Sequence, residues 1–171
     1  KTDVSTMKHR QIMPQKLLGS DACISRSGYS GEDGFEIFID ENGAVPLWEA
    51  FLNEGATACG LGARDTLRIE AGLPLYGHEI DINITPAATK KRIGFEVLDR
   101  AIPRQGYKIF SSEKEIGSVT SGTFSPTLNK PIGMGYIEDQ LTPCPLTLEV
   151  RGQKHPINIV KLPFYRRRAK I

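Results

Sequence analysis

The chain has 171 residues, of which 39% are hydrophobic and 25% charged, and its formal net charge is +2. These values are typical of one large or two small globular domains. So small a net charge gives no indication of nucleic-acid binding. No apolar run approaches the roughly 18 residues that a membrane-spanning helix requires, and the start lacks a signal-peptide pattern. We therefore expect neither a nucleic-acid nor a membrane partner.

The cysteines, Cys23, Cys59 and Cys144, are far apart and odd in number. That arrangement fits neither a disulfide framework nor a zinc site, and reduced thiols are the expected state. The histidines are equally scattered, so the sequence predicts no metal site.

In the N-terminal part of the chain, the first segment gives no secondary-structure signal, and a strand pair is predicted after it. Residues 1–20 show no period, whereas residues 23–39 read as strand, glycine-rich turn and strand. On the second strand, Glu36 shares a face with Phe38. A carboxylate beside an aromatic ring is either a solvated edge residue or a ligand for a flat, donor-rich molecule. The pattern alone favours the solvated residue.

Two helices are predicted next. Apolar residues at helical spacing follow a break at residues 41–43, and this helix ends at Gly55 with Trp48 as its core anchor. The second helix covers residues 63–71. Its residues Arg64 and Arg68 lie one turn apart and repel each other.

The shared face of these two arginines allows three interpretations. It is exposed to solvent, it is paired with acids such as Asp65, or it holds an anion. The segment 73–84 that follows carries Tyr76 and is predicted to be extended or irregular.

Near residue 90 the pattern changes to short strands separated by turn signals. Six strand-like runs lie at residues 93–97, 107–110, 116–120, 132–137, 146–150 and 157–160. This spacing predicts a small barrel or sandwich, and we place a domain boundary at about residue 89. The hydroxyl-rich run 118–126 is interpreted as structural. The pair Gly60 and Gly62 before a helix lacks the third glycine of a dinucleotide fingerprint.

Four motifs together are more specific than any one of them. They are GYSGEDGFE at 28–36, GLGARDTLRIEAGLPLYGHEID at 60–81, VTSGTFSPTL at 119–128 and VKLPFY at 160–165. In their order, in their wording and in the approximate spacing of the first two, they resemble the glycine cleavage system T-protein, or aminomethyltransferase, family. The resemblance covers essentially the whole chain, as a C-terminal half or a discontinuous fragment.

The resemblance implies an α+β fold, in which residues 1–89 are the incomplete C-terminal part of a folate-binding domain and residues 90–171 form a six-stranded β-barrel-like domain. It also implies tetrahydrofolate-dependent transfer of a one-carbon unit, with release of ammonia. The expected partners are the lipoyl-carrying H-protein and the other glycine cleavage components. The expected location is the cytoplasm in bacteria or the mitochondrial matrix in eukaryotes.

The family's ligand residues fall on matching positions of this chain. The glutamate that binds the pterin falls on Glu36, the arginine that contacts folate on Arg64, and the tyrosine of the Leu-Tyr-Gly motif on Tyr76. A carboxylate can accept two adjacent N–H groups of the pterin in parallel. The tail residues Tyr165 and Arg166 are the equivalents of the family's folate-contacting C-terminal tail.

Two departures from the family pattern matter. The family's catalytic aspartate lies outside this chain, so no catalytic residue is assigned. About 40 residues are also missing between the motif at 84–86 and the strand at 91–96, where a connection of a few residues is ordinary. We therefore expect this piece alone to be inactive.

Two related functions stay open. One is a folate-dependent iron–sulfur assembly protein, whose Lys-Gly-Cys-Tyr motif does not occur here. The other is the folate-binding module of a dimethylglycine or sarcosine oxidoreductase, which needs a flavin domain. A third alternative is a binding module with no chemistry of its own.

Overall fold

A computed structural model describes residues 3–82, 84, 90–138 and 145–167. The chain forms two compact units, residues 1–63 and residues 64–171, and each is described by itself. The predicted boundary near residue 89, Cys144 and most of the 84–90 region where the family is longer lie outside the described residues. The boundary therefore stays a prediction.

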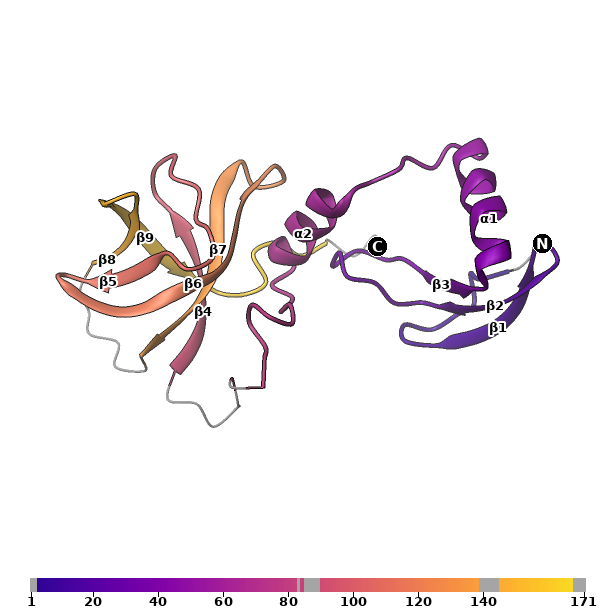
Figure 1. Ribbon diagram of the computed structural model, residues 1–171, viewed down its shortest axis with the longest axis horizontal. Helices are drawn as coiled ribbons and strands as arrows, with labels where there is room; N and C mark the ends of the chain where they lie inside the picture. The colour runs from indigo at the N-terminus through magenta and orange to yellow at the C-terminus, as the bar shows by residue number, and fades with distance from the viewer. Residues whose placement is uncertain (1–2, 83, 85–89, 139–144, 168–171) are drawn as a thin grey trace. The chain divides into compact units, whose positions relative to one another are not determined.

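Unit 1 contains a three-stranded antiparallel sheet in the order β1 (Ile12–Leu17), β2 (Ser20–Ser25) and β3 (Glu36–Ile39) (Figure 1). The predicted strand–turn–strand over residues 23–39 is confirmed. Strand β1 was missed, because it pairs with β2 alone and carries Pro14, which an edge position tolerates. Its side chains alternate between exposed and half-buried, so no apolar run marks it.

Helix α1 (Glu41–Asn53) begins two residues after β3, and Asp40 caps it by accepting a hydrogen bond from the Gly43 amide at 2.7 Å. The predicted break at residues 41–43 is thus the first turn of the helix. A Cβ atom at Gly43 would lie 2.6 Å from Ile39 Cδ1, so a larger residue there would displace the Ile39 side chain of β3.

The prediction that Trp48 anchors the core is wrong, because its side chain is 53% exposed. The half-buried residues of α1 are Leu47 and Ala50. Successive residues of a helix are rotated by about 100°, so Trp48 points away from the side that Leu47 occupies.

Unit 2 contains the predicted barrel, closed in the strand order β4-β7-β6-β5-β8-β9. The strands are β4 (Lys90–Val97), β5 (Lys108–Ser111), β6 (Lys114–Ser125), β7 (Lys130–Glu138), β8 (Leu146–Val150) and β9 (Gln153–Val160). Each overlaps one of the six predicted runs, and β6 continues into the hydroxyl-rich stretch as far as Ser125. Phe95, Ile109 and Leu148 are fully buried inside the barrel.

Helix α2 (Leu61–Glu70) packs on the barrel, and unit 2 begins within this helix (Figure 1). Ile69 is fully buried against Ile132 and Met134 of β7. Burying such a side chain completely contributes about 1.5–3 kcal/mol. Leu162 and Phe164 of the C-terminal segment pack on the same cluster. The fold is therefore α+β with a C-terminal barrel, as predicted.

The two-residue turn between β8 and β9 generates a stability prediction. Arg151 and Gly152 have φ values of 52° and 79°, a combination that favours asparagine followed by glycine. We expect Arg151→Asn to raise the free energy of unfolding by about 0.5 kcal/mol, because asparagine tolerates this backbone better than arginine. Urea denaturation measures the change. Arg151→Val, which is β-branched, should lower the same quantity, and an increase would contradict the interpretation.

Candidate functional site

Glu36 is the first residue of β3 and is exposed. The Ser27 hydroxyl donates a hydrogen bond to its Oε2 atom, and Ser27 Oγ is 2.8 Å from Ser25 Oγ. Phe38, 62% exposed, follows on the same face of the sheet, as the sequence indicated. A carboxylate offers about four acceptor positions. This arrangement therefore leaves Glu36 the capacity to accept hydrogen bonds from a ligand.

The turn before β3 is held by Arg26, a residue that sequence reasoning missed. Its Nε and Nη2 atoms donate to the two carboxylate oxygens of Asp33 at 3.0 and 2.8 Å, and Nη1 donates to the Met7 carbonyl at 2.5 Å. The guanidinium carbon lies 5.7 Å from the centre of the Phe35 ring. The only sequence signal was an arginine seven positions before an acid. This two-pronged ion pair holds the turn that leads into Glu36 in one conformation.

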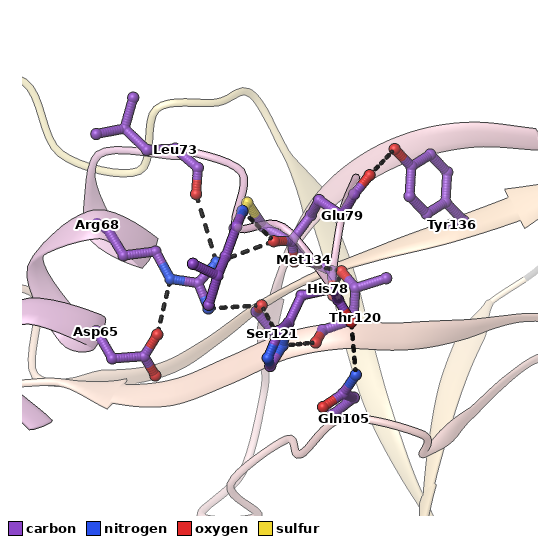
Figure 2. A network of polar contacts seen from close by, with 12 residues as sticks. Asp65, Arg68, Leu73, His78, Glu79, Gln105, Thr120, Ser121, Met134 and Tyr136 are labelled. Carbon is purple, nitrogen blue, oxygen red and sulfur yellow. Dashed lines mark hydrogen bonds and ion pairs between the residues drawn. The ribbon is translucent and has the colours of Figure 1, made fainter. Parts of the chain in front are cut away.

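In unit 2 the two arginines of α2 have different roles. Arg64 is exposed, whereas the Arg68 side chain is only 1% exposed. Arg68 Nε donates to Asp65 at 2.7 Å, Nη1 to Glu79 at 2.9 Å and Nη2 to Ser121 at 2.7 Å (Figure 2). Of the three interpretations of this face, pairing with acids holds for Arg68. Its second acid, Glu79, carried no local signal, because it is distant in sequence and lies in an irregular segment.

Glu79 is fully buried, yet its side chain is well supplied with donors. Besides the Arg68 guanidinium, Oε2 accepts the Leu75 amide at 3.0 Å, and Oε1 accepts the Thr120 hydroxyl at 2.5 Å. Burial alone would raise the pKa of Glu79. Hydrogen bonds from Ser121, Thr120 and the Leu75 amide, together with the charge of Arg68, outweigh burial and lower its pKa below the usual value.

Thr120 reaches Glu79 because β6 is irregular at this point. Val119 pairs with Gly135 and Ser121 with Met134, so Thr120 is an extra residue between them. Such a bulge redirects a side chain that a regular strand would place elsewhere. The Thr120 hydroxyl also approaches the Met134 carbonyl, at 3.1 Å. The hydroxyl-rich run is structural here, as predicted.

A second buried acid, Glu70, connects α2 to the β6–β7 turn. Its Oε1 accepts the Ser125 hydroxyl at 2.5 Å, and its Oε2 accepts the Thr127 hydroxyl at 2.9 Å. The Glu70 carbonyl accepts the Tyr165 amide at 3.0 Å, which joins the C-terminal segment to the helix. A Cβ atom at Gly94 would lie 2.6 Å from Leu162 Cδ2, so a larger residue there would displace the Leu162 side chain of this segment.

The predicted ligand residues therefore lie on three segments of unit 2 and one of unit 1. Arg64 lies on α2, Tyr76 on the loop held by Arg68 and Glu79, and Tyr165 and Arg166 on the segment held by Glu70. Tyr76 is 70% exposed, Arg166 is exposed and Tyr165 is half-buried. Glu36 belongs to unit 1. Within unit 2, all of these segments are tied to α2.

Among the described residues, no cluster of three or more His, Cys, Asp or Glu side chains could hold a metal ion. None of the helices in the described ranges has the length and apolar character needed to cross a membrane.

Comparison with known proteins gave matches along the chain. Residues 1–94 match the family model of the GCVT N-terminal domain, and residues 90–166 match that of the glycine cleavage T-protein C-terminal barrel domain. An aminomethyltransferase of Thermosipho melanesiensis is 43% identical over 98% of this chain and 54% of its own length. One from Geobacillus sp. (strain WCH70) is 40% identical over 97% of this chain and 56% of its own.

A solved structure is also similar. The glycine cleavage system aminomethyltransferase T from Bartonella henselae superimposes with a TM-score of 0.88 and 30% identity, over 97% of this chain and 55% of that one. The chain thus spans about half the length of the relatives that it matches.

The buried Glu79 generates a pH prediction. Its folded pKa lies below the usual value of 4.5, so the unfolded chain binds more protons between these two pKa values. This stabilisation is therefore present above about pH 4.5 and is lost as the pH falls through the folded pKa. In Glu79→Gln the free energy of unfolding should be lower at neutral pH and should fall less on acidification.

Urea unfolding followed by circular dichroism at several pH values tests this. The exposed Glu115→Gln is the matched control and should keep the pH dependence of the unmodified chain. An equally steep acid dependence in Glu79→Gln would show that Glu79 does not contribute to it.

Proposed function

Because the chain belongs to the glycine cleavage T-protein family, we propose that it provides the folate-contacting portion of a tetrahydrofolate-dependent aminomethyltransferase. The observation that carries the proposal is the match of the chain to both family models and to relatives named aminomethyltransferase. The expected partner is a protein that carries the aminomethyl group on a lipoyl arm, within the glycine cleavage system.

The reaction we propose moves one carbon atom. The carbon–sulfur and carbon–nitrogen bonds of the aminomethyl group break, and the carbon forms bonds to two nitrogens of tetrahydrofolate. The protons of those two nitrogens leave with the lipoyl thiol and with ammonia. Such a reaction depends mainly on holding the two reactants in the correct orientation.

The residues of this chain suit the folate side of that reaction. Glu36 is an exposed carboxylate at the end of a strand, suited to the adjacent N–H donors of a pterin. Arg64 and Arg166 are exposed cations, suited to the carboxylates of the folate tail. Tyr76 and Tyr165 offer rings and hydroxyls for stacking or hydrogen bonding.

Glu36→Ala should weaken binding of a reduced folate by about 1.5 kcal/mol or more, roughly tenfold in Kd, because a charge-assisted pair is lost. Titration calorimetry with 5-formyltetrahydrofolate, a stable reduced folate, measures the effect. Glu36→Gln keeps the shape but not the charge and should also weaken binding. Glu49→Ala removes an exposed carboxylate from α1 and should leave Kd unchanged. If Glu36→Ala bound as tightly as the unmodified chain, Glu36 would be a solvated edge residue.

The isolated 171-residue chain should not catalyse the transfer, because the family's catalytic aspartate lies outside it. The assay combines the chain, tetrahydrofolate and an aminomethylated lipoyl carrier, and follows methylene-tetrahydrofolate by absorbance. A rate above that of the mixture without the chain would contradict this prediction.

A further inference from the structure

Tyr76 combines an exposed ring with a fixed backbone. The amides on either side of it are bonded: Leu75 N donates to Glu79 Oε2 at 3.0 Å, and Gly77 N donates to the Ile80 carbonyl at 2.7 Å. The Leu75 carbonyl accepts the amides of His78, Glu79 and Ile80. Tyr76 is 70% exposed, so its side chain contributes little to the core of unit 2. A rigid loop that presents an exposed aromatic ring is suited to contacting a ligand.

The buried Arg68–Glu79 pair attaches this loop to the rest of unit 2. Glu79 bonds to α2 through Arg68 and to β6 through Thr120. Its backbone carbonyl accepts the Tyr136 hydroxyl of β7 at 2.8 Å. Arg68 also donates to the Leu73 carbonyl at 3.4 Å, where the loop begins (Figure 2). The ion pair thus connects the loop to α2 and to β6, and the Glu79 backbone connects it to β7.

Stability alone does not account for a charged pair at this position. Replacing a buried ion pair by apolar residues of similar volume often leaves stability unchanged or raises it. Apolar residues cannot make directional hydrogen bonds. The Glu79 carboxylate can, and its bond to the Leu75 amide fixes where that amide lies. Arg64, one turn before Arg68 on α2, is presented by the same rigid element.

We propose that Arg68 and Glu79 are positioning residues that hold Tyr76 and Arg64 in a fixed relation for a reduced folate. The identity of the ligand rests on the proposed function. The fixed loop is a property of the chain without ligand.

The test is the double variant Arg68→Met/Glu79→Leu, which replaces the ion pair by apolar side chains. Its free energy of unfolding should match or exceed that of the unmodified chain. Its Kd for 5-formyltetrahydrofolate should rise on the order of tenfold, because contact geometry is lost. The Gly77 and Ile80 amides, whose backbone acceptors are unchanged, should exchange hydrogen for deuterium faster.

A matched control replaces the exposed pair Lys108–Glu115, as Lys108→Met/Glu115→Leu, and should alter neither Kd nor exchange. A second variant, Thr120→Val, keeps the ion pair but removes one hydrogen bond to Glu79. It should increase both Kd and exchange by smaller factors, and it serves if the double variant does not fold.

Two outcomes separate this inference from the proposed function. If the double variant, or Thr120→Val in its place, keeps both the Kd and the slow exchange of Gly77 and Ile80, Arg68 and Glu79 do not position the loop. If the unmodified chain binds no reduced folate, the proposed function fails, and the exchange rates alone then decide whether the pair fixes the loop.

Discussion

The buried ion pair between Arg68 and Glu79 is the interaction on which the polar contacts between α2, the loop that carries Tyr76 and β6 depend. Removing two charges from water costs several kcal/mol each, and their mutual attraction repays this only when the remaining donors and acceptors are satisfied. Here Asp65 and Ser121 complete the guanidinium, while Leu75 and Thr120 complete the carboxylate. Because each partner would be left charged and buried without the other, neither residue can be lost alone without a large loss of stability.

The barrel strand β6 is shaped by this requirement. Its hydroxyl groups meet α2 at three points, through the pairs Thr66–Thr123, Arg68–Ser121 and Glu70–Ser125. A regular apolar strand could pack against Ile69, but it could not satisfy these polar groups. The bulge at Thr120 adds the remaining donor to Glu79. Polar docking of this kind fixes both the position and the rotation of the helix on the barrel.

Local sequence patterns predicted where helices and strands form better than they predicted what packs around each element. The six barrel strands followed from turn signals and β-branched runs, because those signals are local. The exposed Trp48 and the missed strand β1 depend on what packs around them, which periodicity does not report. Glu79 could not be foreseen either, because its partners come from α2, β6 and its own loop. The resemblance to a family supplied the ligand residues, and the residues alone left Glu36 undecided.

The two arginines of α2 show how burial separates residues that a motif places together. Arg64 and Arg68 belong to the same run, are four positions apart and have the same chemistry, so a pattern cannot assign them different roles. Burial does assign them different roles, because the Arg68 guanidinium is 1% exposed and bonded to two acids, so a ligand cannot reach it. The exposed guanidinium of Arg64, on the same helix, is accessible to a ligand. The same contrast holds between the buried Glu79 and the exposed Tyr76 beside it. In this part of the chain, buried polar residues set the geometry, and exposed residues next to them are the ones to test for binding.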